Sequence, residues 1–557
     1  MPSSILLSCF CFCFLLIHSF STSSTATIYS NETDRLALIA IKSRLHDPLR
    51  VTSSWNNSVP ICLWAGVSRG RRHQRVMELD LRNQSIGGDL SPSIGNLSFL
   101  RSINLEDNNF HGNIPNEVSL PFRLETLVLA NNFFSGTIPN NLSHFSKLIE
   151  LNALRNNLQR EIPTEIGNLL KLETLDIGKN HLAGQLPDSI GNLSALQVLH
   201  VDVNSLYGTI PYSLGKLRSL EKLNVAVNSI SGMVPLPIFN ISSLIHIVLA
   251  LNRLHGSLPR NIGYDLPKLK LLSIGGNNFT GHLPFSLSNT SNLQRIDLSV
   301  SSFNGKVLID FSGFKSLSFL NLGENNLGTG TANDLHFLTS LINCSKLEVL
   351  ALNENQFGGA LPKFIANLSN TMSRLHIGGN QIYGSIPPGI VNLVNLHGLC
   401  IEINQLSGTI PHDIGNLKKL QILYLHENSL RGSIPVSLGN LTLLTKLFLF
   451  SNNLKGSIPS SLGNCQNLMS LSLSKNKLTG ILPQQIVGIT TLSLALVVSD
   501  NLLSGPFPSQ LGNLKTLIAL DISKNRFSGE IPGTLDSCTS LEILYYHIKQ
   551  LIGIFFS

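Results

Sequence analysis

The chain has 557 residues, a formal net charge of +7 and 13% charged residues. This positive charge is mild for the length, and the lysines and arginines are scattered, which argues against nucleic acid as a partner. Beyond residue 26 no apolar segment approaches the ~20 residues that a membrane-spanning helix needs, so no membrane span is expected in this chain.

Residues 1–26 combine an apolar run with a short segment of small residues. The run extends from Ile5 to Ile17, and the small residues end at Ala26. The run is too short to span a bilayer and resembles the apolar region of a secretory signal peptide. Residues 1–26 are therefore predicted to direct secretion.

Residues 27–74 are expected to form an N-terminal cap. Apolar residues recur at helical spacing from Leu36 to Leu45, which predicts an amphipathic helix that Pro48 stops. A compact aromatic segment with Trp55 and Trp64 follows. The basic cluster from Arg69 to Arg75 has no interleaved aromatic residues, so we interpret it as a solvated loop.

From residue 75 to 544 the chain repeats a unit of about 24 residues. Its pattern is Leu-x-x-Leu-x-Leu-x-x-Asn-x-Leu-x-Gly-x-Ile-Pro, and one copy runs from Leu444 to Pro459. A unit this short cannot bury its own leucines, so the copies must stack and share one core. The frames from Val76 to Leu517 give about 19 repeats, with an insertion at 329–346 and a non-repeat tail at 545–557.

The spacing within the unit predicts its local structure. The segment Leu-x-x-Leu-x-Leu alternates with a period of two, which turns its fourth and sixth positions inward on a short strand. Asparagine at the ninth position, as in Asn108 and Asn476, can satisfy backbone groups where the strand turns away. Glycine and Ile-Pro predict turns and short 3₁₀ pieces in the second half.

The fold class is therefore α/β, a repeat solenoid that forms a curved superhelix. A parallel sheet lines its concave face, short 3₁₀ turns line the convex side, and a helical cap covers the N-terminal end. In the insertion, Leu335, Leu338 and Leu341 recur at helical spacing after Asn333. They predict a short convex-side helix with Asn333 as its cap.

No catalytic constellation is found, so the chain is not expected to be an enzyme. Asp310-Phe311-Ser312 superficially resembles a kinase metal loop, but it lies inside a repeat, and no catalytic-loop motif accompanies it. Cys344, Cys465 and Cys538 lie at positions where a small apolar side chain packs, so buried thiols are the simpler interpretation. No metal site and no cofactor are predicted.

Ligand recognition on such a solenoid belongs to the exposed strand positions. Adjacent parallel strands lie ~4.8 Å apart, so residues at one position of consecutive repeats form a contiguous patch. Exposed aromatic clusters often mark binding sites, because rigid rings supply contact area at little entropic cost. The candidate ligand-binding residues of this patch are His376, Cys400, Glu402, Tyr424, His426, Phe448 and Phe450.

A second stripe is apolar in three successive repeats, at Val203, Val227 and Leu251. We interpret it as another candidate contact surface on the concave face. For both patches the alternative is that scattered exposed apolar residues are ordinary on protein surfaces.

Acceptor sites for N-linked glycans agree with a secreted protein, although the repeat itself contains Gly-Asn-Leu-Ser/Thr and so produces some by chance. The predicted glycosylation sites are Asn31, Asn56, Asn83, Asn96, Asn141, Asn192, Asn240, Asn278, Asn289, Asn343, Asn367 and Asn440.

Four segments carry a resemblance to a known family. They are E-T-D-R-L-A-L from Glu32, C-x-W-x-G-V from Cys62, G-R-R-H-Q-R-V from Gly70 and N-D-L-x-F-L-T-S-L from Asn333. With the repeats, they make residues 27–545 resemble the extracellular part of plant leucine-rich-repeat receptor-like serine/threonine kinases, in the subfamily of peptide-sensing immune receptors. The resemblance implies non-catalytic binding of a peptide or protein ligand in defence signalling, with a co-receptor ectodomain as a further partner.

The chain departs from this family in two ways. The resemblance implies a cap disulfide, but Arg69 stands where the partner of Cys62 is expected, and losing that short loop costs ~2.5 kcal/mol on the chain-entropy model. Relatives continue into a membrane span and a kinase, so the resemblance implies an ectodomain truncated before both, located outside the cell, or at its surface if the intact gene encodes the span. A soluble inhibitor of a secreted cell-wall-degrading enzyme and a truncated product without function of its own remain the alternatives.

Overall fold

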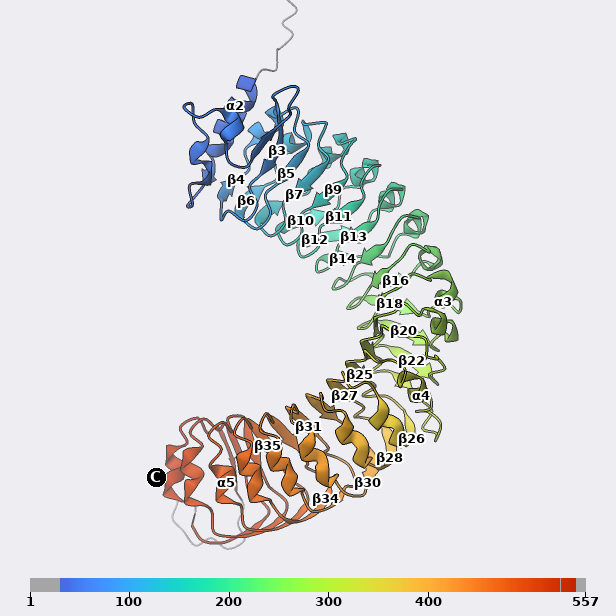
Figure 1. The fold of residues 1–557 in the computed structure, drawn as a ribbon, viewed down its shortest axis with the longest axis vertical. Coiled ribbons are helices and arrows are strands. Elements are labelled where there is room, and N and C mark those ends of the chain that lie inside the picture. The colour runs from blue at the N-terminus through green and yellow to red at the C-terminus, as the bar shows by residue number, and fades with distance from the viewer. Residues whose placement is uncertain (1–30, 531, 547–557) are drawn as a thin grey trace, which may run out of the picture. The chain divides into compact units, whose positions relative to one another are not determined.

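The computed structural model describes residues 31–530 and 532–546. The predicted signal peptide and residues 547–557 of the predicted tail lie outside the described residues. The chain forms two compact units, Met1–Leu172 and Glu173–Ser557, whose ribbons run from blue to cyan and from cyan to red in Figure 1.

The first unit begins with the predicted amphipathic helix, α2 (Asn31–Lys42), which buries Leu38 and Ile41. Acidic residues in its first turn suit the positive end of the helix dipole. The expected stop at Pro48 is wrong, because the helix ends at Lys42 and the chain passes into β1 (Leu45–His46). This strand pairs antiparallel with β4 (Gly87–Asp89) and so ties the cap to the first repeat.

A buried ion pair also joins the cap to the first repeat. Asp34 of α2 and the side chain of Arg75 are 1% and 4% exposed, and Arg75 Nη2 lies 2.6 Å from Asp34 Oδ1. Asp34 Oδ2 accepts hydrogen bonds from Arg75 Nε and from the Val76 N–H, each at 2.8 Å. The interpretation of Arg75 as part of a solvated loop is therefore wrong, because Asp34 supplies the partner that makes its burial tolerable.

The aromatic segment of the cap packs around two tryptophans. The rings of Trp55 and Trp64 stack with centroids 6.0 Å apart, and each indole N–H donates to a backbone carbonyl at 2.9 Å. Cys62 is a free, exposed thiol. The chain then forms β2 (Val67–Arg69), which pairs antiparallel with the first strand of the repeats.

Each repeat contributes one short strand to a main sheet, and neighbouring strands pair in parallel one repeat apart. In the first unit these strands are β3 (Val76–Asp80), β5 (Ser102–Asn104), β7 (Thr126–Val128) and β9 (Glu150–Asn152). In the second unit they are β11 (Thr174–Asp176), β13 (Val198–His200), β15 (Lys222–Asn224), β17 (His246–Val248), β19 (Leu271–Ser273), β21 (Arg295–Asp297), β23 (Phe319–Asn321), β25 (Val349–Ala351), β27 (Arg374–His376), β29 (Gly398–Cys400), β31 (Ile422–Tyr424), β33 (Lys446–Phe448), β35 (Ser470–Ser472), β37 (Ala495–Val497), β39 (Ala519–Asp521) and β41 (Ile543–Tyr545).

A second set of short strands follows the turn of each repeat and also pairs in parallel. Besides β4, the first unit has β6 (Asn109–Asn113), β8 (Phe133–Gly136) and β10 (Asn157–Glu161). The second unit has β12 (His181–Gln185), β14 (Ser205–Tyr207), β16 (Ser231–Met233), β18 (Arg253–Gly256), β20 (Asn278–Gly281), β22 (Ser302–Gly305), β24 (Asn326–Leu327), β26 (Gly358–Ala360), β28 (Gln381–Ser385), β30 (Gln405–Ser407), β32 (Arg431–Gly432), β34 (Asn453–Ser457), β36 (Lys477–Gly480), β38 (Leu502–Gly505) and β40 (Arg526–Phe527).

The predicted alternation of buried and solvent-facing positions is confirmed. Leu447 and Leu449 are fully buried, whereas Phe448 between them is only half-buried. The turn after the strand needs a left-handed residue at Ser451 (φ 52°). Pro459 (φ −67°, ψ 129°) then leads into a 3₁₀ turn, as predicted for Ile-Pro.

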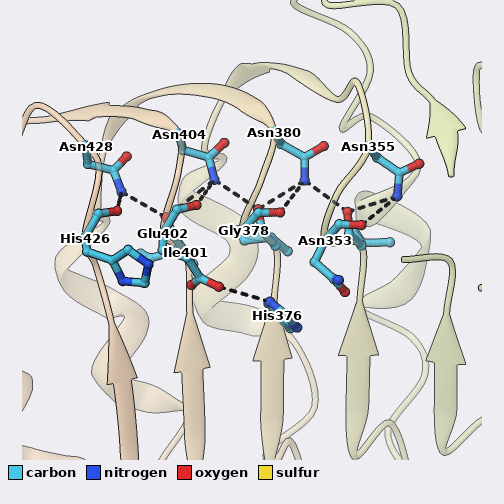
Figure 2. Close-up of polar contacts among 12 residues, drawn as sticks. Asn353, Asn355, His376, Gly378, Asn380, Ile401, Glu402, Asn404, His426 and Asn428 are labelled. Atoms are coloured by element: carbon cyan, nitrogen blue, oxygen red, sulfur yellow. Dashed lines mark hydrogen bonds and ion pairs between the residues drawn. The ribbon is translucent and has the colours of Figure 1, made fainter. Parts of the chain in front are cut away.

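Asparagines at the ninth position form a ladder of amide hydrogen bonds that links consecutive repeats (Figure 2). The Oδ1 atom of Asn404 accepts from the Ile382 N–H at 2.9 Å. Its Nδ2 donates to the carbonyl oxygens of Ile377 and Glu402 at 3.1 and 2.9 Å. The predicted structural role of these side chains is therefore confirmed.

The insertion forms a shorter helix than predicted. The helix α4 (Leu338–Leu341) has a single turn, and Phe337 rather than Asn333 precedes it. Asp334 organises the preceding loop instead, because its carboxylate accepts hydrogen bonds from the N–H groups of Thr329 and Gly358 at 2.8 and 3.1 Å. The other one-turn helices of the described residues are α3 (Ile262–Asp265) and α5 (Gln484–Val487).

Candidate functional site

The predicted ligand-binding patch lies on the solvent-facing side of the main-sheet strands, called the sheet face below. Strand pairing places His376, Cys400, Tyr424 and Phe448 opposite one another on β27, β29, β31 and β33. All four side chains are half-buried. The sequence therefore predicted correctly that these residues come together in one row.

Four rings of this patch form the aromatic cluster, which consists of Tyr424, His426, Phe448 and Phe450. Tyr424 stacks on Phe448 with centroids 4.7 Å apart and an interplanar angle of 7°. His426 stacks on Phe450 at 4.2 Å, and the two pairs meet edge to face between Tyr424 and His426 at 5.8 Å. Such stacking holds the rings in place before any partner arrives, so little side-chain entropy is left to lose on binding.

Burial changes the acid–base behaviour of two members of the cluster. It lowers the pKa of His426, although Glu402 and Glu427 act in the opposite direction. It raises the pKa of Tyr424, and Cys400 and Glu402 add to that rise. Both rings are therefore neutral at pH 7 and present an uncharged aromatic surface.

Glu402 departs from the prediction that it is an exposed face residue, because it is only 9% exposed. Its side chain bends over Gly378, where an added Cβ would lie 2.6 Å from Glu402 Cδ. From there Oε1 lies 3.2 Å from His376 Nε2, as the dashed line in Figure 2 shows. The physical reason is local: the missing side chain at Gly378 leaves room that a long acidic side chain fills.

The second carboxylate oxygen of Glu402 is unusual. Oε2 is buried and has no hydrogen-bond partner among the described residues, and the same holds for Nδ1 of His426. A buried polar atom without a partner costs roughly 1–3 kcal/mol, and more when the group is charged. These two atoms, on neighbouring repeats just after the strands, are therefore buried without the hydrogen bonds that would compensate for the loss of water.

Cys400 separates His376 from Tyr424 in the row, and Gly398, two residues earlier on the same strand, lies between Arg374 and Ile422. Gly398 carries no side chain, and the only atom that an added Cβ would approach is Arg374 Cγ, at 3.9 Å. Cys400 lies beside it, and burial together with Glu402 raises the pKa of its thiol to about 12. The thiol is therefore neutral at pH 7 and unsuited to act as a nucleophile or a metal ligand.

The stripe of Val203, Val227 and Leu251 is exposed but does not lie on the strands. These residues have positive φ angles of 51°, 55° and 57° and form the turn just before the ladder asparagine. They lie in this turn because the repeat has already left the strand at this position, and the contact surface that they were expected to form stays a prediction. Gly276 (φ 67°) holds the equivalent position of the next repeat and interrupts the stripe, and Val300 follows in the repeat after it with φ 50° and 46% exposure.

Ten of the twelve predicted glycosylation sites are exposed, and Asn56 and Asn141 are half-buried. Seven of the twelve lie in 3₁₀ turns, away from the main-sheet strands: Asn96, Asn141, Asn192, Asn240, Asn289, Asn367 and Asn440. A glycan on these seven sites would leave the aromatic cluster accessible.

Other groups on the described residues show no competing chemistry. Within residues 31–530 and 532–546, no three histidine, cysteine or acidic side chains gather in a way that could hold a metal ion. No described helix has the length and apolar character needed to cross a bilayer. Cys344, Cys465 and Cys538 are buried, as predicted.

Sequence reasoning missed the two glycines that shape the site, Gly378 and Gly398. Both break the repeat pattern at positions that face solvent, where a missing side chain is easily dismissed. Comparison of the same position in neighbouring repeats could have identified them.

The chain belongs to the leucine-rich-repeat proteins. The sequence profile of the family described as leucine-rich repeat region matches residues 127–235 and 297–479, and that of the leucine-rich repeat N-terminal domain matches residues 31–68. The fold, a solenoid of parallel strands with short 3₁₀ turns, is the one expected from the sequence. Its resemblance to the extracellular domain of plant receptor kinases is confirmed by the individual relatives.

Among these relatives, the LRR receptor-like serine/threonine-protein kinase EFR of Arabidopsis thaliana is 65% identical over 376 residues, which are 67% of this chain and 36% of the relative. Receptor kinase-like protein Xa21 of Oryza sativa subsp. japonica is 43% identical over 89 residues, 16% of this chain and 9% of the relative. The chain thus matches little more than a third of the length of the first of these curated relatives and less than a tenth of the second.

Solved structures agree with this assignment. The ectodomain of the Arabidopsis receptor kinase HAESA, in complex with an N-terminally extended IDA peptide hormone, has a TM-score of 0.79 and 30% identity, with 94% of each chain covered. A complex of HAESA with IDA and the co-receptor SERK1 has a TM-score of 0.68 and 28% identity, with 94% of this chain and 99% of that chain covered.

Proposed function

We propose that this chain binds a peptide, or an extended segment of a protein, on its sheet face without catalysing a reaction. The aromatic cluster anchors the partner, and the chain acts as the extracellular recognition part of a receptor-like kinase in plant defence. The observation that carries this proposal is the stacked set of four rings, Tyr424, His426, Phe448 and Phe450, which two consecutive repeats bring together on the sheet face.

Physical arguments favour a peptide as the partner. Binding energy at protein interfaces concentrates in a few buried aromatic residues surrounded by weaker contacts. Rings that already stack on one another lose little freedom on binding, so more of the contact energy appears as affinity. Similarity to ectodomains whose crystal structures contain peptide hormones supports the same class of partner here.

Two finer parts of the proposal rest on similarity. The cap and insertion motifs resemble those of peptide-sensing immune receptors, which supports a role in defence. The complex of HAESA with IDA and SERK1 supports a co-receptor ectodomain as a second partner.

The proposed location is outside the cell or at its surface. Exposure of ten predicted glycan acceptors supports passage through the secretory pathway. On the same grounds we propose that the exposed acceptors carry glycans.

The test compares the protein with a variant in which Tyr424, Phe448 and Phe450 are all replaced by alanine. Both are secreted from plant cells, labelled and applied to an array of acetylated, amidated nonapeptides of random sequence. Peptides that bind the natural chain should lose at least a hundredfold in affinity for the variant. The thermal melt should stay nearly unchanged, because these side chains do not belong to the core.

A matched control replaces three exposed residues of the 3₁₀ side, Tyr212, Leu236 and Val436, by alanine. This variant should bind the array like the natural chain. Equal peptide binding by the natural chain and the Tyr424/Phe448/Phe450 variant would contradict the proposal, as would an array on which the natural chain binds nothing.

A further inference from the structure

The carboxylate of Glu402 lacks the partners that a buried charge needs. It is 9% exposed, its Oε1 meets only His376, and its Oε2 has no partner among the described residues. His376 is the only ion-pair partner that the described residues offer it, since no lysine or arginine lies within ion-pair distance. A carboxylate held this way is poorly hydrated and poorly compensated, so an added cation would stabilise it strongly.

Further negative charge lies beside it. Glu354, two repeats before Glu402, extends over Gly379 of the repeat between them, where an added Cβ would lie 2.5 Å from Glu354 Oε1. Glu354 and Glu402 therefore approach the adjacent glycines Gly379 and Gly378 from the two sides. Because neither glycine carries a side chain, the two carboxylates can lie close to the backbone here and concentrate negative charge.

The aromatic cluster borders this carboxylate on the other side. Tyr424, at the end of β31, and His426, just after it, belong to the repeat that follows Glu402, whose charge acts to raise the pKa of both. Aromatic faces attract cations through their quadrupole, and arginine in particular stacks on them. A carboxylate next to aromatic faces is thus suited to a guanidinium or an ammonium group, with its aliphatic stem on the rings.

We propose that Glu402, seated over Gly378 and beside the edge of Tyr424, forms a site for a cationic side chain of the peptide that the aromatic cluster anchors. This inference rests on the proposed function and specifies its ligand class: a peptide with an arginine or lysine next to the residues that contact Tyr424, Phe448 and Phe450. The terminal torsion of glutamate is broad, so the carboxylate turns readily and exposes Oε2 to the incoming donor.

Arg374 is the nearby cation that would compete. It is exposed, its Cγ lies along Gly398, and its charge acts on Cys400. Replacing Arg374 with glutamine removes a positive charge that would repel the cationic side chain of the peptide. Cationic peptides should therefore bind the Arg374→Gln variant more tightly than they bind the natural chain.

The test uses the same array of capped nonapeptides, now synthesised in matched pairs. Each arginine peptide has a twin with neutral citrulline at that position, and each lysine peptide a twin with acetyl-lysine. Among peptides whose binding requires the aromatic cluster, the cationic member should bind the natural chain at least tenfold more tightly. Glu402→Gln should abolish that difference, whereas Glu427→Gln, the same change at an exposed residue one repeat away, should preserve it.

Gly378→Ala supplies a variant without a charge change. The added Cβ would lie 2.7 Å from Glu402 Oε1 and force the carboxylate away, at a residue whose φ tolerates a side chain. The cationic preference should fall severalfold, whereas Gly313→Ala, where only Ser291 Cβ comes within 4 Å, should leave it intact. Melting curves of all variants verify that they fold.

The outcomes separate the two proposals. If peptides that need the aromatic cluster bind equally tightly in their charged and their neutral forms, the cationic site is overturned and the proposed function stands. The cationic site is also overturned if Glu402→Gln retains the full preference. An array without any peptide that needs the aromatic cluster overturns both.

Discussion

Replacing a ladder asparagine with alanine should cost several kcal/mol, although the change removes only one amide. Asn476 is 8% exposed. Its Nδ2 donates to the carbonyl oxygens of Leu449, Leu473 and Ser474 at 3.0, 3.1 and 3.1 Å, and its Oδ1 accepts from the Leu454 N–H at 3.0 Å. Alanine leaves these backbone groups without a partner in a place that water cannot easily reach.

The magnitude follows from counting the bonds that an amide can make. Two N–H groups and one oxygen sustain three effective hydrogen bonds, each with a net value of ~1 kcal/mol, and more where the abandoned group stays buried. We expect Asn476→Ala to lower the free energy of unfolding by about 3–4 kcal/mol. Asn453→Ala, at the exposed position that follows the ladder residue Asn452 of the preceding repeat, should change it by less than about 0.5 kcal/mol.

Urea unfolding measures the total loss, and hydrogen exchange followed by mass spectrometry locates it. Because each repeat contacts mainly its neighbours, protection should be lost in β33, β35 and β37 and kept in distant strands. A loss below about 1 kcal/mol, or an increase of exchange spread evenly over the unit, would refute the reasoning.

Three further changes test other parts of the account. Ser301 holds the ladder position with a hydroxyl that reaches a carbonyl only at 3.3 Å, so Ser301→Asn should raise the free energy of unfolding by ~1 kcal/mol, and an unchanged urea midpoint would contradict this. Burial alone would raise the pKa of Asp334, but its hydrogen bonds outweigh burial and hold the pKa below 3.8. The ionised Asp334 carboxylate therefore stabilises the fold above pH 3.8, and this stabilisation is lost as the pH falls through the pKa of the folded state. Asp334→Asn should thus lower the free energy of unfolding by about 2 kcal/mol at pH 7. A difference between the variant and the natural chain that persists in acid would count against this prediction. Leu447→Ala should cost roughly 2–5 kcal/mol in calorimetric melts and Phe448→Ala less than about 1 kcal/mol; the reverse order would mean that the alternation is misassigned.

Much of the fold could be predicted because the repeat makes local spacing sufficient. The period of two placed Leu447 inward and Phe448 outward, and the ladder asparagines could be recognised from position alone. In such a unit each residue meets the equivalent residue of the next repeat, so one copy predicts the rest. This regularity is why the row from His376 to Phe448 can be identified from the sequence alone.

The positions that the sequence did not predict correctly share a different cause, because each depends on a local feature that the spacing of residues does not reveal. Glu402 is buried because Gly378, one repeat earlier, leaves a space for it. Arg75 is buried because Asp34, 41 residues away, reaches it. Val203 and its equivalents lie in a left-handed turn, which a hydrophobicity pattern cannot distinguish from the end of a strand.

The measurement that tests the central claim most directly is the hydrogen-exchange footprint of a bound peptide on the natural chain. The peptide is the tightest binder from the array, and exchange is compared with and without it at saturation. The account predicts new protection in β27, β29, β31 and β33 and in the turns that follow them, with no change in the 3₁₀ turns. Protection confined to the 3₁₀ side, or to the first unit, would contradict recognition by the sheet face.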